Sequence, residues 1–302
     1  MSKKLPNNKI LFSADGSEFY LDESLRELPD KRLVCRGLWK QRRVIAKLFL
    51  DPRNASRHWA REKQGIDALQ RAGVPTPELI YSGLAADGSP VLVSSYLPDA
   101  DTALDIWARS SSLELKAALL RKLAEMVGRM HESGLVQEDQ HLENFLAVEN
   151  KIYAIDGDAI RIRNEGKPLG LKASSQNLAL LFAQFPPNHE DLFEPAALNY
   201  ARLRNISYLP LLARLKRDLP DVRRKRRRKY IQKCTRTCSE FVRSQKAGRT
   251  AVFRRDAQGE TLSRLLNDPQ TFMQSGKCLK NGKTSTVVRV QDNGVDWVVK
   301  RY

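Results

Sequence analysis

The chain has 302 residues, 41% of them hydrophobic, which is enough for one two-lobed domain or two small domains with an ample core. Its 52 Lys and Arg residues outnumber 35 Asp and Glu residues, and the net charge of +17 attracts polyanions: nucleic acid, an anionic membrane surface or a phosphorylated substrate. No stretch approaches the roughly 20 apolar residues of a membrane span, and the N-terminus lacks the apolar run of a signal peptide. The four cysteines are too scattered for a disulfide framework, and Cys234 and Cys238 lack the further ligands of a zinc site. These features predict a soluble cytoplasmic protein.

The first part of the chain changes character near residue 30. Residues 1–30 are expected to form a loosely structured lead, with short strands around an Asp15-Gly16 turn. After this lead, residues 33–39 suggest a strand and a turn, and residues 43–50 predict a clear strand.

Lys47 is the one charge within the apolar part of that second strand. On a strand it shares a face with Ile45 and Phe49. A lysine in a strand interior is costly unless it is paired, so a carboxylate or phosphate partner is expected. The alternative is an edge strand from which the lysine reaches water.

The next helix offers Lys47 a partner. Asn54 or Ser56 can cap a helix that runs to about Ala72, and Glu62 lies in its first half. A strand lysine followed by a helix glutamate is the ion pair that positions the α- and β-phosphates of ATP in kinases. The alternative is that Glu62 is one more solvated surface charge.

A hairpin and a long helix follow. Residues 79–81 and 91–97 flank an Ala86-Asp87-Gly88 turn and predict two antiparallel strands. The second strand runs into Pro98, as expected of a hinge between two lobes. A helix of buried character is predicted over residues 113–131.

The stretch after that helix carries the chemistry. Asp139, Asn144 and Asp156 fall within 18 residues, each beside apolar residues that would hold it in place. Taken singly, each is most often a turn former or a cap. Together, on a strand, a loop and a further strand, they have the catalytic-loop and metal-loop spacing of a nucleotide-dependent phosphotransferase.

A basic run lies in the C-terminal third. It consists of seven consecutive residues: Arg223, Arg224, Lys225, Arg226, Arg227, Arg228 and Lys229. We expect it to lead into a helix with Cys234, Cys238, Phe241 and Val242 on one side. Such a run can be merely solvated, or it can bind anionic lipid or nucleic-acid phosphates. The lack of interleaved aromatic residues argues against nucleic acid.

The last 31 residues, 272–302, repeat an earlier theme. Strand-like segments join at an Asp292-Asn293-Gly294 hairpin signal, and the final one carries Lys300 as the earlier strand carries Lys47. The tail therefore resembles the start of a second, related unit.

The order Lys47, Glu62, Asp139, Asn144 and Asp156 resembles the protein-kinase-like superfamily. More narrowly, the chain looks like the bacterial lipopolysaccharide core kinases, the heptose and Kdo kinase family. Two short motifs carry this narrower resemblance: Gly73-Val74-Pro75-Thr76-Pro77 and Met130-His131-Glu132-Ser133-Gly134. The resemblance covers about residues 32–245.

The resemblance implies an α+β, two-lobed protein-kinase-like fold with a small antiparallel N-lobe, a mostly helical C-lobe and a C-terminal extension resembling a second N-lobe. We expect a lead over residues 1–30, the N-lobe over 31–97, the C-lobe with the basic helix over 98–248, and the partial second N-lobe over 249–302.

By the same resemblance the chain is a kinase that uses ATP and Mg²⁺. Asp139 would be the catalytic base, and Asn144 and Asp156 the metal ligands. The nucleotide would be bound by Lys47, Glu62, Gly37, Ile45 and Tyr96.

The chain departs from the family pattern at several positions. Gln137 stands where a histidine usually precedes the catalytic Asp, and Gly157-Asp158 replaces the usual Phe-Gly. Asn177 takes the place of the helix Asp that props the catalytic loop, Gly37 is what remains of the Gly-rich loop, and Ile45 replaces a smaller residue. None of these changes removes a group that catalysis requires, but together they allow a weakened enzyme.

Three interpretations follow. The first is a sugar kinase of lipopolysaccharide core assembly, peripheral to the inner membrane through the basic run. The second is a protein or aminoglycoside-type kinase, and the third is a non-catalytic module that binds lipopolysaccharide or a partner enzyme. The basic run favours the first over the second, and the intact Asp139, Asn144 and Asp156 favour it over the third.

Overall fold

The computed structural model of the chain describes residues 9–11, 16–238, 240–246 and 248–302, and these form a mixed α+β structure with antiparallel sheets. The chain divides into two compact units, Met1–Arg224 and Lys225–Tyr302, with the division inside helix α6. The elements up to α6 are β1 (Lys9–Leu11), β2 (Glu18–Leu28), β3 (Arg32–Trp39), β4 (Arg42–Phe49), α1 (Ala55–Arg71), β5 (Leu79–Leu84), β6 (Pro90–Ser95), β7 (Asp101–Thr102), α2 (Ala103–Arg109), α3 (Leu113–Glu132), β8 (Leu135–Gln137), η2 (Leu142–Asn144), β9 (Phe145–Val148), β10 (Lys151–Ala154), η3 (Gly157–Ala159), β11 (Ile160–Ile162), α4 (Leu171–Phe182), η4 (Pro187–Leu192), α5 (Phe193–Leu203) and α6 (Tyr208–Lys233). The remaining elements are β12 (Phe241–Lys246), β13 (Arg249–Arg254), η5 (Arg255–Ala257), α7 (Glu260–Asn267), α8 (Pro269–Gln274), β14 (Lys277–Asn281), β15 (Thr286–Asp292) and β16 (Val295–Arg301).

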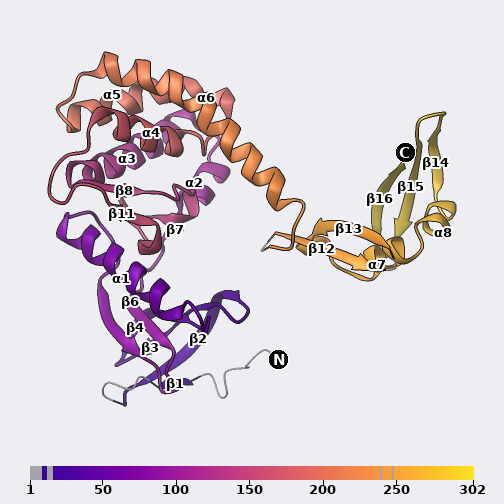
Figure 1. The fold of residues 1–302 in the computed structure, drawn as a ribbon, viewed down its shortest axis with the longest axis horizontal. Helices are drawn as coiled ribbons and strands as arrows, with labels where there is room; N and C mark the ends of the chain where they lie inside the picture. The colour runs from indigo at the N-terminus through magenta and orange to yellow at the C-terminus, as the bar shows by residue number, and fades with distance from the viewer. Residues whose placement is uncertain (1–8, 12–15, 239, 247) are drawn as a thin grey trace. The chain divides into compact units, whose positions relative to one another are not determined.

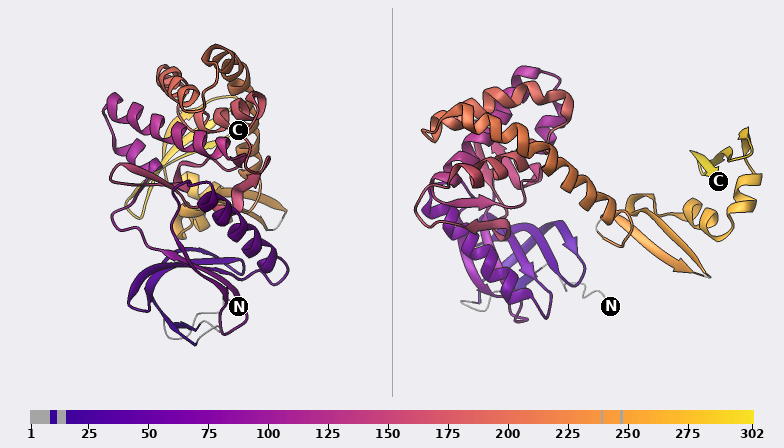
Figure 2. Two further views of the ribbon diagram at one scale, coloured as in Figure 1. Left: turned by 90° about the vertical axis from the view of Figure 1, so that its left-hand side faces the viewer. Right: turned by 45° about the horizontal axis from the view of Figure 1, so that its top comes forward.

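The first unit begins with a six-stranded antiparallel sheet in the order β1-β2-β3-β4-β6-β5 (Figures 1 and 2). Side chains alternate across its strands, so Cys35 and Ala46 point into a core around Phe19. Val34 and Lys47, which are paired neighbours on β3 and β4, point to the other face, where the cavity described below lies. Alternate residues of β3 and β4 therefore lie in the core on one face and at the cavity on the other.

The loose lead expected over residues 1–30 is wrong for its second half. β2 is an 11-residue strand that pairs along β3. It escaped the prediction because most of its side chains are exposed and two register shifts interrupt its alternation. The Asp15 side of the expected turn lies outside the described residues.

Helix α1 follows the prediction closely. It spans Ala55–Arg71 with Asn54 as its N-cap residue, and Gly73 adopts a φ of 63° just past its end. The Asn54 side chain donates to Asp51 and not to the helix. The buried face of α1 includes Glu62 and Leu69.

Helices α3 to α6 and the short strands around them form the larger part of the first unit (Figure 1). α3 spans Leu113–Glu132, as predicted within one residue, and Ser112 caps it by accepting from the Leu115 amide at 3.3 Å. Its buried residues join one large apolar core with α4, α5 and α6. The β9–β10 hairpin and the β8–β11 pair extend from this core.

The second unit has its own small core. Phe272 and Met273 of α8 pack on Val288 and Val290 of the three-stranded sheet β14-β15-β16. The antiparallel strands predicted for the tail are present, and Asn293-Gly294, both with positive φ, turn β15 into β16.

Two expectations for the C-terminal third are wrong. The helix that contains the basic run ends at Lys233, and Phe241 and Val242 lie on strand β12. The boundary expected between residues 248 and 249 falls inside the β12–β13 hairpin, where it would separate paired strands. Among the described residues, no helix is long and apolar enough to cross a membrane.

Candidate active site

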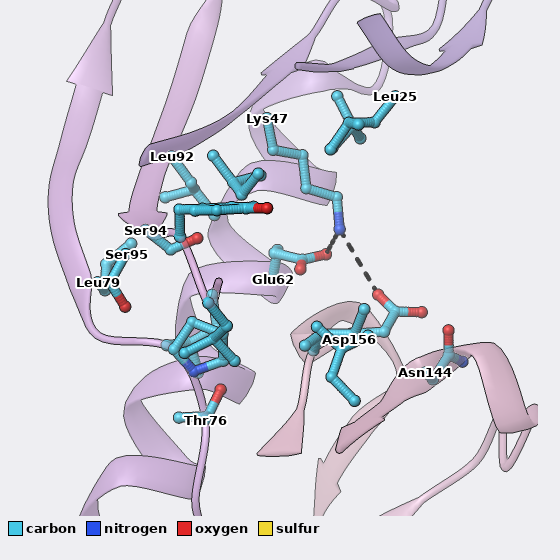
Figure 3. Close-up of a pocket in the computed structure, with 18 of the residues that line it drawn as sticks. Leu25, Lys47, Glu62, Thr76, Leu79, Leu92, Ser94, Ser95, Asn144 and Asp156 are labelled. Atoms are coloured by element: carbon cyan, nitrogen blue, oxygen red, sulfur yellow. Dashed lines mark ion pairs between the residues drawn. The ribbon is translucent and has the colours of Figure 1, made fainter. Parts of the chain in front are cut away.

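The first unit contains a cavity of about 360 Å³ beside the face of the six-stranded sheet that carries Val34 and Lys47 (Figure 3). Its walls are built from strands, α1 and the stretch that ends at Asp156. The lining residues are Leu25, Arg26, Arg32, Val34, Ile45, Lys47, Glu62, Ile66, Thr76, Pro77, Leu79, Leu92, Ser94, Ser95, Tyr96, Leu97, Ala100, Asn144, Leu146, Ile155 and Asp156. Figure 3 shows Leu79 and Leu92 toward one side of the cavity, and Lys47, which extends from β4, beside Glu62 and Asp156 toward the other side.

The ion pair predicted between Lys47 and Glu62 is present. Lys47 Nζ lies 2.7 Å from Glu62 Oε2 and 3.6 Å from Asp156 Oδ1 (Figure 3). Burial raises the pKa of Glu62 and the neighbouring Lys47 charge opposes this rise. The pair fixes an ammonium group at the wall of the cavity.

Glu62 also holds the loop after Asp156. Its Oε1 accepts from the Gly157 amide and its Oε2 from the Asp158 amide, both at 3.3 Å. The glutamate thus connects strand β4, helix α1 and the loop that follows β10.

Asn144 and Asp156 line the cavity together. The Ile155 amide donates to the Asn144 carbonyl at 3.1 Å, which ties the two ends of the β9–β10 hairpin to one another. Asn144 Nδ2 donates to the carbonyl of Asp139 at 3.0 Å. Asp139 itself is exposed and does not contribute to the cavity wall.

The donor set near Asp156 fits a magnesium ion. Asp156 Oδ1 is buried and accepts no hydrogen bond from any residue that the structure describes. Within the described part of the chain, no group of three or more His, Cys, Asp or Glu side chains is arranged to hold a metal ion by itself. Mg²⁺ in nucleotide sites is commonly held by one or two protein ligands plus phosphate oxygens, so Asp156 and Asn144 meet that requirement.

Gln137 and Asn177, which differ from the family pattern, form hydrogen bonds that hold the chain on both sides of the site. Asn177 Nδ2 donates to the Gln137 carbonyl at 2.8 Å, and Gln137 Nε2 donates to the Asp156 carbonyl at 3.4 Å. Asn177 Oδ1 accepts from Gln140 Nε2 and from the ring of His131, both at 2.9 Å. An amide here therefore serves as donor and acceptor at once.

His131 is neutral in this network. Burial lowers the pKa of His131 to about 4, so the ring donates from Nε2 to Asn177 and accepts at Nδ1 from the Tyr200 hydroxyl at 2.6 Å. Arg204 Nη1 in turn donates to the Tyr200 oxygen at 2.8 Å. The network connects the loop before Asp139 to helices α3, α4 and α5.

Two of the three further nucleotide contacts that were expected lie at the cavity, and one does not. Ile45 and Tyr96 are in its wall, whereas Gly37 is not. A Cβ at Gly37 would overlap the Phe19 ring and the Tyr20 carbonyl. This glycine therefore serves the packing between β2 and β3 and is not part of a phosphate loop.

One wall of the cavity, here called the roof, was not predicted from the sequence. It is the β2–β3 hairpin, whose turn contains Pro29 and Asp30 and which contributes Leu25, Arg26 and Arg32 to the wall. The signal that could have found it is the Pro-Asp turn between two segments of strand-forming residues. In place of glycines, this roof contributes two arginine residues to the cavity lining.

The comparisons with known proteins agree with this geometry. Residues 38–186 match the family described as "Lipopolysaccharide kinase (Kdo/WaaP) family", a range that includes Lys47, Glu62, Asp139, Asn144 and Asp156. No curated protein matches the chain. A kinase of this family is a phosphotransferase, and the match over residues 38–186 confirms the resemblance to the lipopolysaccharide core kinases.

Proposed function

We propose that this protein is an ATP-dependent kinase that phosphorylates a sugar hydroxyl, on heptose or Kdo, of the lipopolysaccharide inner core at the cytoplasmic face of the inner membrane. The observation that carries the proposal is the placement of Lys47 between Glu62 and Asp156 in the cavity wall. In this proposal the sheet with α1 is the N-lobe and the helical part of the first unit is the C-lobe.

The nucleotide base would occupy the apolar side of the cavity, against Ile45 and Leu92. Its phosphates would then lie toward Lys47, which the Glu62 carboxylate keeps extended. Arg26 and Arg32 of the roof add positive charge on the same route. These cations bind and orient the phosphate chain.

Asp156 and Asn144 would hold Mg²⁺, which neutralises charge on the transferring phosphoryl group when it is bound. The Asn144 amide also fixes the main chain at Asp139 through its 3.0 Å hydrogen bond. Asp139 is exposed at the loop, where it can orient an incoming sugar hydroxyl and accept its proton.

The acceptor proposal draws on the family and on charge. The basic run of α6 lies in an ordered helix, and Arg227, Arg228 and Lys229 are exposed. Inner-core sugars are attached to a lipid, so a cationic helix would bring the kinase to the anionic surface that carries its substrate. The second unit, with its three-stranded sheet, would be the beginning of a second kinase-like N-lobe.

A genetic experiment tests the whole proposal. Core oligosaccharide from a strain lacking this gene should lose one phosphate by mass spectrometry, and the wild-type gene should restore it. Asp139→Asn should not restore it, although the variant protein still binds Mg-ATP by calorimetry. An unchanged core in the deletion strain favours a protein or small-molecule kinase, and a wild-type protein that binds no Mg-ATP favours a non-catalytic module.

A further inference from the structure

Asp158, two residues after Asp156, is surrounded by cationic and imidazole side chains from two other elements. Arg61 of α1 donates from Nε to Asp158 Oδ1. Arg32 Nη2 of β3 lies 3.7 Å from Oδ2, and His58 Nδ1 of α1 lies 3.5 Å from the same oxygen. Both carboxylate oxygens are therefore engaged, and the side chain is 16% exposed.

The Asp158 carboxylate forms ion pairs with cations from two elements, Arg61 of α1 and Arg32 of β3. Unlike Asp156, Asp158 does not line the cavity. Its carboxylate faces α1 and β3, which argues against a role as a metal ligand.

The main chain beside Asp158 is in direct contact with α1. A Cβ on Gly65 would overlap the Gly157 carbonyl, and a Cβ on Gly157 would overlap the Glu62 carbonyl. Two glycines thus let helix and loop approach without an intervening side chain. The Glu62 carboxylate accepts both loop amides at the same place.

A second link runs from Asp158 toward Asp139. Arg161 Nη1 donates to the Asp158 carbonyl at 2.7 Å, and Arg161 Nε lies 3.2 Å from Glu138 Oε2. Glu138 directly precedes Asp139. Helix α1 is therefore linked both to the loop after Asp156 and to the loop that contains Asp139.

We propose that Asp158 is a positioning residue for phosphotransfer: its carboxylate, through Arg61, fixes α1 against the loop after Asp156 so that Glu62 stays on Lys47 before any nucleotide binds. This inference rests on the proposed function. In this arrangement the Lys47–Glu62 pair forms before nucleotide binds. Gly157-Asp158, which replaces the usual Phe-Gly, holds α1 in the position that the pair requires.

The test compares Asp158→Asn and Arg61→Gln, which remove the two partners separately, with the double variant. Lys63→Gln is the matched control, because it removes an ion pair between two residues of the same helix, Lys63 and Asp67. Hydrogen exchange in the nucleotide-free protein should become faster in α1 for both single variants, with the double variant no faster than either, and should stay at the wild-type rate in the control.

Steady-state kinetics give the second readout. Both single variants should lower kcat by about tenfold, an effect equivalent to about 1.4 kcal/mol, with a smaller change in KM for ATP and an unchanged Mg²⁺ requirement. Arg61→Lys, which keeps a cation at this position, should recover most of kcat. Wild-type exchange in α1 for Asp158→Asn would overturn the inference, as would a raised Mg²⁺ requirement in Asp158→Asn alone. Because exchange is measured without substrate, it decides the inference even if the wild type shows no turnover.

Discussion

The side-chain amide of Asn177 donates to the main-chain carbonyl of Gln137 at 2.8 Å, two residues before Asp139. The same side chain accepts two further hydrogen bonds, from Gln140 and His131. One buried amide thus determines the conformation of the loop that presents the expected base.

Replacing Asn177 by Ala should therefore affect stability and turnover together. Three buried hydrogen-bonding groups lose their partner, which should lower the free energy of unfolding by about 2–4 kcal/mol. Turnover should fall more than Mg-ATP affinity, because the cavity wall is not touched. Gln176→Ala, at the exposed neighbouring position, is the control. Urea unfolding measures the stability, calorimetry measures the Mg-ATP affinity, and a steady-state assay measures the turnover. Equal losses in binding and turnover would assign Asn177 a general structural role.

The buried neutral His131 predicts a pH dependence of stability. The folded-state pKa of about 4 lies below the ordinary value of 6.5, so between these pH values the unfolded chain binds a proton that the folded chain does not. Stability should consequently fall as the pH is lowered from 6.5 to 4, with a contribution from this residue of about 3 kcal/mol over that window. His131→Gln cannot take up this proton and should show a flatter profile there. Parallel profiles for the two proteins would contradict the assignment.

The site residues differ in how visible they are in the sequence. The placement of Lys47 at the cavity could be predicted because one charge interrupts an apolar strand, and that of Asn144 and Asp156 because their spacing is local, whereas the role of Asp139 stays a prediction. Gly37 was misassigned because a glycine required for packing looks the same as a glycine in a phosphate loop. The role of Asp158 is invisible locally, since its partners Arg61 and Arg32 come from a helix and a strand far away in sequence.

The roof of the cavity shows a second limit. β2 carries few buried side chains and two register shifts, so it lacks the period-two pattern by which strands are recognised. Without β2 as a strand, the β2–β3 turn could not be identified as the cover of the site, and Arg26 was not considered.

Arg26 gives a prediction specific to the phosphates. Arg26→Gln should weaken ATP binding by about fivefold, the scale of one solvent-exposed charged contact, and should leave adenosine binding unchanged. Arg42→Gln, an exposed arginine on β4 away from the cavity wall, is the control. Calorimetry with both ligands distinguishes the outcomes, and an equal loss for adenosine would mean that Arg26 acts on the pocket shape and not on phosphate.

The basic run should act on surface binding and not on chemistry. Replacing Arg226, Arg227 and Arg228 by Gln should weaken co-sedimentation with anionic vesicles by roughly 1 kcal/mol per residue near the surface, and the wild-type interaction should fade as salt is raised. Mg-ATP binding should be unchanged, since none of the three lines the cavity. Vesicle binding equal to that of the wild type would remove the basic run from the proposed membrane contact.

The last prediction concerns the independence of the second unit. Every residue of the cavity wall lies between Leu25 and Asp156, within the unit that ends at Arg224. The second unit has a separate core around Phe272 and Val288. Removal of the chain after Lys233, at the end of α6 and before the β12–β13 hairpin, should leave Mg-ATP affinity within about twofold of the full chain.

The truncated protein also tests the idea of a second kinase-like N-lobe. Lys300 lies over the Tyr302 ring at 4.5 Å, and it is not among the residues that line the cavity at Lys47. Nucleotide binding should therefore be lost with Lys47→Ala in the full chain and unaffected by Lys300→Ala, with calorimetry as the measurement. If truncation after Lys233 abolished binding at the Lys47 site, the tail would be shown to complete the first unit, and its interpretation as the start of a separate repeat would be wrong.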